Sequence, residues 1–412
     1  MCKENRMDRS KINIGTYYLA AYASTEEHVK ELAECGIDMV VNMRYDLPAL
    51  DLFSKYGVGA IVTGVLPGWF GGNGSNAGTM KDTNPIEKYD LAAATFKDHP
   101  AIWGIDTGDE PSALDFPHYG EIFEHVRNGF KEQFPYLNIY PSYAVKGSNT
   151  EQEILEQLGT EDYKTYIQSF CENVESDYIC FDYYLYSADL AGLYETLSVV
   201  FDAALDKKRQ MWMVLQVNSH QEDKWISTEQ LRFQANSALA FGAEVITWAC
   251  YCAGWWYHHV LDKQGNKTQQ YEKLKTVNGE IHDLSQEYMK YRPIDTKFVG
   301  DFTAEELEKS NREAVAVLDT DCFKNFKVDA GHKLLVGIRM SDDAAADKEA
   351  LMICSADDPY DEAPAICHIS FRADGKKVRA LGREDMQPLI MNEDGSYSLV
   401  IRSNEGVLIV AE

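Results

Sequence analysis

The strongest constraint on the fold is a regular alternation of apolar strands and amphipathic helices over roughly the first 290 residues. The expected strands cover residues 12–20, 37–43, 58–65, 101–111, 137–143, 178–186, 211–218 and 244–252. Eight strand–helix units are the number and size of a (β/α)₈ barrel, and such a TIM barrel is the α/β fold that we expect for residues 1–291. A doubly wound open sheet is the alternative, but no glycine-rich phosphate-binding motif follows the first strand.

The pattern changes after Tyr291. Short apolar runs are now separated by Asp, Gly, Asn and Lys turns, and the runs include residues 314–318, 334–338, 351–354, 366–371, 397–401 and 406–410. Strand-length runs with turn signals between them are typical of an antiparallel β-sandwich. We therefore expect a barrel domain at residues 1–291 and an accessory β-sandwich at residues 292–412.

The charge of the chain limits its partners. Its 39 basic and 66 acidic residues give a net charge of −27, which repels phosphate backbones and anionic lipid. The sequence contains no run of about twenty apolar residues, the length that a membrane span needs. We therefore expect a neutral substrate, no nucleic-acid partner and no membrane partner. The sequence carries no signal for an oligomeric state.

The cysteines and histidines give no sign of a disulfide framework or a metal site. The nine cysteines include no Cys-x-x-Cys pair, and residues 1–11 lack the apolar segment of a signal peptide. We expect reduced, buried thiols in a cytoplasmic protein. His258 and His259 have no matching acid or histidine at regular spacing, so we expect no metal and no cofactor.

The segment from Ala101 to Pro111 carries the clearest functional signal. It begins as an apolar strand and ends in Asp109 and Glu110, followed by a proline that fixes the local backbone. Catalytic groups of parallel barrels lie where the strands end, so Glu110 is a candidate proton donor. The alternative is an acidic turn before a helix, since the same residue types suit helix starts.

Several features together resemble the clan of retaining glycoside hydrolases built on (β/α)₈ barrels, which includes β-galactosidase-like and cellulase-like families. These features are the eight strands, the motif from Trp103 to Pro111, Trp248 in an aromatic eighth strand and the trailing sandwich. The clan usually has Asn-Glu-Pro where this chain has Asp-Glu-Pro. The resemblance implies that Glu110 is the general acid/base.

The chain departs from the clan at the seventh strand. The resemblance implies a glutamate nucleophile there, but the sequence has Gln216, and a neutral amide cannot form a glycosyl ester. Because hydrolysis by paired carboxylates needs a second acid, we expect Asp182, at the end of the sixth strand, to supply it. Other candidates for this second acid are Glu222, Asp109 and Asp46. The alternative role for Asp182 is a structural acid that holds a neighbouring group.

Sugar rings combine apolar faces with hydroxyl edges, so their sites combine flat aromatic rings with amides and acids. Residues of these types stand at or near the expected strand ends, and those that we predict to bind substrate are Asn42, Trp69, Asp109, Tyr143, Tyr184, Gln216, Asn218, His220, Trp248 and Trp256. Trp103, early in the fourth strand, is expected to be a core residue instead.

The sequence, together with this resemblance, therefore predicts a metal-independent glycoside hydrolase whose substrate is a small-molecule glycoside or a neutral oligosaccharide. Two other classes stay open. One is a sugar-binding barrel without hydrolytic activity, which Gln216 would explain. The other is a sugar lyase that abstracts a proton with a tyrosine or histidine base. The barrel fold alone does not separate these functions.

Overall fold

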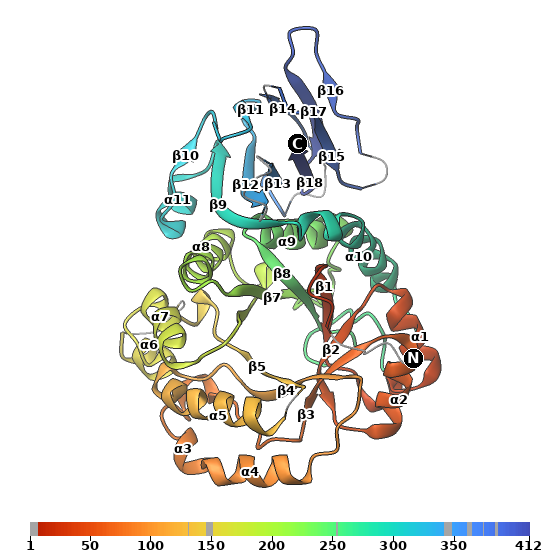
Figure 1. Cartoon of the computed structure of the whole chain (residues 1–412), viewed down its shortest axis with the longest axis vertical. Helices are drawn as coiled ribbons and strands as arrows, with labels where there is room; N and C mark the ends of the chain where they lie inside the picture. Colours follow the sequence, from red (N-terminus) through yellow and green to blue (C-terminus); the bar gives the residue numbers. More distant parts are fainter. Residues whose placement is uncertain are drawn as a thin grey trace.

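The protein is described by a computed structural model, which describes residues 7–130, 132–145, 151–252, 254–341, 348–360, 365–373, 375–383 and 386–412 (Figure 1). Among these residues, no helix combines the length and apolar character that crossing a membrane requires. The chain forms a barrel of parallel strands and, beside it, two packed antiparallel sheets.

Eight parallel strands form the barrel in the order β5-β4-β3-β2-β1-β8-β7-β6. They are β1 (Asn13–Tyr17), β2 (Met39–Arg44), β3 (Gly59–Thr63), β4 (Ile102–Asp109), β5 (Phe134–Asn138), β6 (Tyr178–Tyr183), β7 (Gln210–Gln216) and β8 (Ala243–Ala249). Just beyond β5, the backbone N–H of Ile139 donates a 2.9 Å hydrogen bond to the carbonyl of Cys180, which joins β5 to β6. The predicted (β/α)₈ barrel is confirmed.

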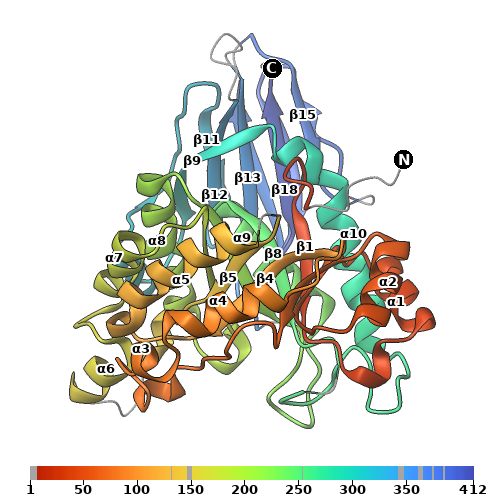
Figure 2. The same ribbon diagram turned by 60° about the horizontal axis from the view of Figure 1, so that its bottom comes forward.

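Helices surround the barrel (Figures 1 and 2). They are α1 (Glu26–Glu34), α2 (Leu47–Tyr56), α3 (Met80–Thr83), α4 (Ile86–Thr95), α5 (Phe116–Gly129), α6 (Glu151–Leu158), α7 (Tyr163–Asn173), α8 (Leu190–Lys207), α9 (Thr228–Ala240) and α10 (Gln269–Tyr288). At the start of α9, Ser227 and Gln230 form a reciprocal capping box.

Aromatic side chains fill the barrel interior near the starts of the strands. The rings of Tyr178 and Trp212 stack with centroids 3.9 Å apart, and Trp103 is buried beside them as predicted. A Cβ at Gly59 would lie 2.1 Å from the Trp103 ring, so only glycine fits there. Because this end is filled, the polar site is confined to the other end, where the strands finish.

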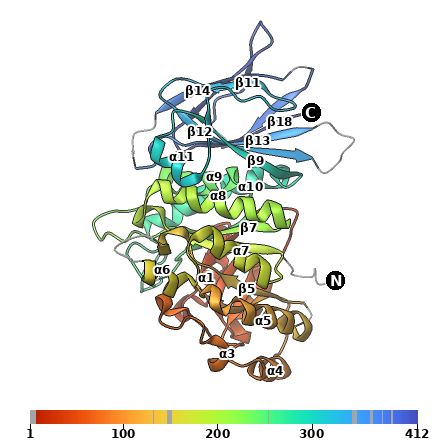
Figure 3. The same cartoon turned by 90° about the vertical axis from the view of Figure 1, so that its left-hand side faces the viewer.

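The remaining strands form two sheets that pack face to face (Figure 3). The six-stranded sheet has the order β10-β9-β12-β13-β18-β15, and the four-stranded sheet has the order β11-β14-β17-β16. The strands are β9 (Tyr291–Gly300), β10 (Ala314–Val315), β11 (Lys324–Val328), β12 (Lys333–Ser341), β13 (Glu349–Ser355), β14 (Ile366–Arg372), β15 (Val378–Leu381), β16 (Ile390–Met391), β17 (Tyr397–Arg402) and β18 (Gly406–Ala411). A short helix, α11 (Ala304–Ser310), follows β9. All pairs are antiparallel except the two-residue pair of β9 and β10, so the predicted sandwich is confirmed.

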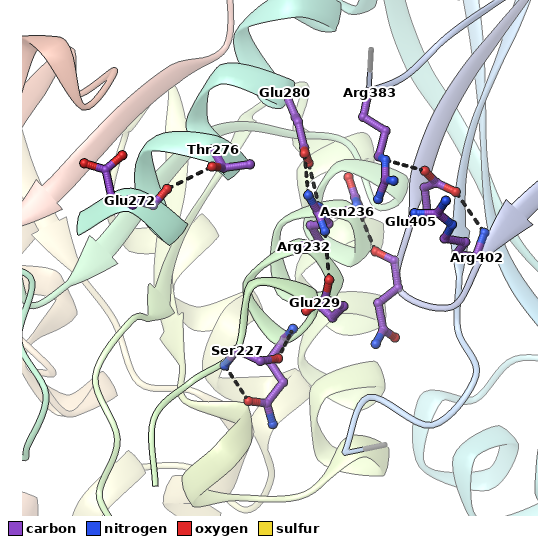
Figure 4. Close-up of polar contacts among 12 residues, drawn as sticks. Ser227, Glu229, Arg232, Asn236, Glu272, Thr276, Glu280, Arg383, Arg402 and Glu405 are labelled. Atoms are coloured by element: carbon purple, nitrogen blue, oxygen red, sulfur yellow. Dashed lines mark hydrogen bonds and ion pairs between the residues drawn. The ribbon is translucent and has the colours of Figure 1, made fainter. Parts of the chain in front are cut away.

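The sandwich rests on the α8, α9 and α10 side of the barrel, and one apolar core runs through both (Figures 1 and 3). A Cβ at Gly337 in β12 would lie 2.1 Å from the Ala240 carbonyl, so this glycine lets the end of α9 approach the sheet. Polar contacts also join the barrel and the sandwich (Figure 4): the side-chain amide of Asn236 in α9 donates a hydrogen bond to the Asn404 carbonyl. The division into two domains at residues 291/292 stays a proposal.

Candidate active site

The acids at the end of β4 are held in an unusual backbone path. Glu110 has φ +44°, a left-handed conformation that costs energy in a residue with a side chain. Its N–H donates a 2.9 Å hydrogen bond to the carbonyl of Asn138, and the Asp109 N–H donates to the Trp69 carbonyl at 3.0 Å. Gly108 has φ +144°, and a Cβ there would lie 2.3 Å from the Tyr119 hydroxyl and 3.0 Å from the Trp69 carbonyl, so a side chain would not fit. The surrounding structure therefore holds Asp109 and Glu110 in place despite this cost.

One amide group links two strand-end carboxylates. Nδ2 of Asn138, the last residue of β5, donates to Oδ1 of Asp109 at 3.2 Å and to Oδ1 of Asp182 at 2.8 Å. These two acceptor oxygens therefore lie no more than about 6 Å apart. The Tyr143 hydroxyl donates to the other oxygen of Asp182 at 2.8 Å. Asp182 is buried, at 2% exposure, and both of its oxygens accept hydrogen bonds.

Burial and mutual repulsion raise the pKa values of these acids. Burial raises the pKa of Asp182 to about 6, and the hydrogen bonds from Asn138 and Tyr143 limit the rise. Burial, followed by the charges of Asp182 and Asp106, raises the pKa of Asp109 to about 7. Burial and the charges of Asp182 and Asp109 raise the pKa of Glu110 well above its usual value. The surroundings thus favour the protonated form of Glu110, whereas the hydrogen bonds to Asp182 favour its charged form.

An aromatic wall stands beside the carboxylates. Tyr17, Trp255, Trp256 and Tyr184 contact one another in sequence, edge to face, with ring centroids 5.8, 6.3 and 4.8 Å apart. Tyr17 ends β1, and Tyr184 directly follows β6, the strand that carries Asp182. Burial raises the pKa values of both tyrosines, and the charge of Asp109 adds to each rise. Asn42, at the end of β2, contacts the Tyr17 hydroxyl at 3.4 Å. The site therefore combines flat rings, amides and acids.

No protein-family model matches the chain, and no curated protein matches its sequence. A solved structure of a catalytic mutant of Gan42B, a GH42 β-galactosidase from G. stearothermophilus, matches with a TM-score of 0.53 at 9% identity, covering 98% of each chain. The chain shares the fold of this β-galactosidase.

Two further structures match with TM-scores below 0.5. AbfB, a family 51 α-L-arabinofuranosidase from Bifidobacterium longum, has a TM-score of 0.43 at 10% identity and covers 98% of this chain and 96% of its own. A glycoside hydrolase family 5 mannosidase from Rhizomucor miehei has a TM-score of 0.42 at 12% identity and covers 67% of this chain and 94% of its own.

Gln216, where the resemblance implies a nucleophile, is fully buried and serves a neighbouring loop. Its Oε1 accepts from the Tyr186 N–H at 2.9 Å, and its Nε2 donates to the Ser187 hydroxyl and the Asn218 carbonyl at 3.1 and 2.9 Å. Tyr186 and Ser187 belong to the segment after β6, so Gln216 anchors that segment to the end of β7. Asn218 is also fully buried, and its Oδ1 accepts from the Cys250 N–H.

The structure does not bring all the predicted binding residues together. Trp248 is fully buried between β8 and α10, where its indole N–H donates a 2.9 Å hydrogen bond to Asn278. It therefore lies outside the barrel, away from the acids. His220 lies on the rim, with Nδ1 3.1 Å from the Ser187 hydroxyl. Trp69 is half-buried beside Asp109 and has a buried indole nitrogen without a hydrogen-bond partner.

Sequence reasoning missed three residues of the site. The predicted fifth strand, 137–143, includes Asn138 and continues beyond it, whereas the observed strand ends at Asn138. This earlier end, and the 3₁₀ turn at Ser142–Val145, carry Tyr143 over Asp182. Tyr17 ends β1, and Asp106 has a pKa raised by burial to about 6. All three lie at or near strand ends, and that position was the available signal.

The described histidines and cysteines do not build a metal centre at this mouth. His258 and His259 contact backbone carbonyls of Glu222 and Trp255. One group of three potential ligands, His332, Asp357 and Cys367, lies in the sandwich. Burial raises the pKa of the Cys367 thiol to about 12, which disfavours the thiolate that a metal needs.

Proposed function

We propose that this protein is a glycoside hydrolase of the barrel clan, with Glu110 as the general acid and Asp182 as the second carboxylate. The observation that carries the proposal is the pairing of Asp182 with Asp109, the neighbour of Glu110, through the side chain of Asn138, at the end of the barrel where parallel strands finish. Cleavage of a glycosidic bond needs two carboxyl groups in different protonation states.

The environments of the two acids give them different roles. Two hydrogen bonds favour the charged form of Asp182, whose pKa is raised only to about 6. Among the described residues, no group donates a comparable hydrogen bond to Glu110 that would offset burial and the charges of Asp182 and Asp109, which raise its pKa. Glu110 is therefore suited to donate a proton, and Asp182 is suited to act as an anion.

In the first step, Glu110 protonates the glycosidic oxygen while the bond from that oxygen to the anomeric carbon breaks. Asp182 attacks the anomeric carbon and forms a glycosyl ester. Water then hydrolyses the ester, and Glu110 takes the proton from the water. Oxygens of Asp109 and Asp182 lie about 6 Å apart at most, so these two acids and Glu110, which follows Asp109 in the chain, form one acid cluster.

The substrate class follows from the surroundings. Tyr17, Trp255, Trp256 and Tyr184 offer aromatic surface for a sugar ring, and the net charge of −27 disfavours anionic substrates. A neutral glycoside or oligosaccharide fits both features.

The eight cysteines among the described residues are free and buried, which supports a reducing, cytoplasmic location. The reaction needs no cofactor.

The other two classes have less support. Gln216 in the expected nucleophile position suggests a binding protein without activity. However, its side-chain amide forms hydrogen bonds with Tyr186 and Ser187 in the segment after β6. Asp182, on another strand, can supply the missing acid. A lyase with a tyrosine base needs a lowered tyrosine pKa, whereas burial raises the pKa values of Tyr17, Tyr143 and Tyr184.

The test compares turnover of aryl glycosides and natural oligosaccharides by the wild-type protein, Glu110→Gln and Asp182→Ala. Both variants should lose at least about 100-fold in kcat on unactivated substrates. Added azide should restore turnover of activated aryl glycosides by Asp182→Ala, because the small anion attacks in place of the missing carboxylate. Glu87→Gln, an exposed glutamate on the outer helix α4, is the control for loss of a carboxylate.

The configuration of the product, followed by NMR, separates the possible outcomes. Retained configuration supports Asp182 as a nucleophile, and inverted configuration reassigns it as the base that activates water. Wild-type turnover by Glu110→Gln would refute the assignment of the acid. Saturable sugar binding without turnover by the wild-type protein would identify a binding protein instead.

A further inference from the structure

A hollow of about 650 Å³ lies on the rim of the barrel mouth, beside the segment that follows β7. We call it the rim hollow and define it by six of its lining residues, Tyr186, His220, Asp223, Lys224, Trp225 and Tyr360. Tyr360 comes from the loop after β13, so the sandwich supplies one wall. Ser227 and Glu229, at the start of α9, also line it (Figure 4).

The rim hollow is connected to the acid cluster through Ser187. This residue ends the 3₁₀ turn Leu185–Ser187, which directly follows the strand that carries Asp182. The Ser187 hydroxyl contacts both Nε2 of Gln216 and Nδ1 of His220 at 3.1 Å. Just before this turn, Tyr184 has a pKa that burial and then the charge of Asp182 raise. Tyr186, within the turn, lines the rim hollow. The two sites therefore lie on either side of one short segment.

The chemistry of the rim hollow suits a neutral ligand with many hydroxyl groups. Tyr186 and Tyr360 meet edge to face with centroids 5.8 Å apart, and Tyr360 is 48% exposed. Asp223 and Lys224 are exposed and have opposite charges, so the hollow offers both an acceptor and donors without a strong excess of either charge. Aromatic rings combined with such groups bind sugars better than phosphates or apolar ligands.

A second hollow, at the opposite end of the barrel, cannot serve the same purpose. It measures about 440 Å³ and is lined by Ile102, Trp103 and Phe134, which stand at the starts of β4 and β5. The filled interior around Trp103 separates that hollow from the acids. A second sugar unit of a bound substrate can therefore reach the rim hollow but not this opposite end.

We propose that the rim hollow is a second saccharide subsite, so that the substrate is an oligosaccharide that extends from the acids, over Ser187, to Tyr360 and Trp225. This inference rests on the proposed hydrolase function for the acid cluster. It also assigns the sandwich a direct part in substrate binding, because Tyr360 belongs to it.

The experiment measures kcat/KM on an aryl monoglycoside and on neutral di- to pentasaccharides of the same sugar. The variants are Tyr360→Ala, Trp225→Ala and, as the control for loss of a partly exposed tyrosine, Tyr56→Ala on the outer helix α2. Tyr360→Ala should lower the ratio of kcat/KM on long substrates to kcat/KM on the monoglycoside about tenfold, the effect of one lost aromatic contact. Tyr56→Ala should leave that ratio at the wild-type value.

Binding of the same oligosaccharides to Glu110→Gln by calorimetry gives a second reading that does not depend on turnover. Tyr360→Ala in this background should weaken the longer ligands about tenfold. Hydrolysis with an unchanged ratio would overturn the subsite but not the hydrolase. Binding without hydrolysis, weakened by Tyr360→Ala, would uphold the subsite and overturn the hydrolase. The absence of any oligosaccharide binding would overturn the subsite.

Discussion

The side-chain amide of Asn138 donates a 2.8 Å hydrogen bond to Oδ1 of Asp182, across the junction where β5 meets β6. The same nitrogen also reaches Asp109, so one uncharged residue at the barrel closure fixes the spacing of two carboxylates. This relationship makes Asn138 a positioning residue, whose effect should be visible in the pH dependence of the reaction.

Replacing Asn138 with alanine should raise the pKa of Asp182, because the carboxylate loses a donor that favours its charged form. The acidic limb of the kcat/KM profile should move to higher pH, and kcat should fall roughly 10- to 100-fold. Tyr143→Phe removes the other donor to Asp182 and should move the limb in the same direction. A loss of activity with an unmoved acidic limb would indicate a purely structural role.

The wild-type profile of kcat/KM against pH should be bell-shaped. Activity should rise through about pH 6 as Asp182 loses its proton. It should fall again at higher pH as Glu110 loses its own, since the pKa of Glu110 is raised well above its usual value. An acidic limb near pH 4, the usual range for aspartate, would contradict the assignment of Asp182.

Asp109→Asn should stabilise the protein at alkaline pH. The pKa of Asp109 is raised to about 7 in the folded state, so its contribution to stability is present below the unfolded pKa of about 4 and is lost as the pH rises through about 7. Calorimetry at pH 8 should show Tm about 2–4 °C above wild type, and the gain should disappear near pH 4. A gain that is equal at both pH values would exclude this electrostatic cause.

Gln216→Glu should not create a nucleophile. Nε2 of Gln216 donates to Ser187 and to the Asn218 carbonyl, and a glutamate has no hydrogens to replace these donors. The buried acid should lower the free energy of unfolding by about 1–3 kcal/mol and lower turnover. Gln221→Glu, in the loop after β7, is the control for the added charge. Turnover above wild type would show that β7 carries the nucleophile position after all.

Gly337→Ala should loosen the contact between barrel and sandwich. A Cβ at Gly337 would lie 2.1 Å from the Ala240 carbonyl, whereas a Cβ at Gly279 in α10 meets nothing within 4 Å. Chemical denaturation should show a loss of about 1–3 kcal/mol for Gly337→Ala. Gly279→Ala should instead gain about 0.5–1 kcal/mol, the helix preference for alanine. Equal effects of the two variants would exclude the close approach as the cause.

Much of the architecture could be predicted from local patterns. The eight strand–helix units, the sandwich and the buried position of Trp103 follow from the periodicity and spacing of apolar residues, which the structure confirms. Trp248 shows the limit of such patterns. An aromatic residue near a strand end can face either side of the sheet, and this one faces α10.

The sequence by itself determined the barrel, the sandwich and the acids at the end of β4, because each depends on residues close together in the chain. Only the tertiary structure decided which groups meet those acids. Asn138 and Asp182 are 44 positions apart, and they meet because the barrel closes between β5 and β6. Likewise, the side-chain amide of Gln216 donates a hydrogen bond to the Ser187 hydroxyl. Tyr360 lines the rim hollow only because the sandwich rests against the barrel. Side-chain contacts of this kind depend on strand register and domain packing, which local periodicity does not specify.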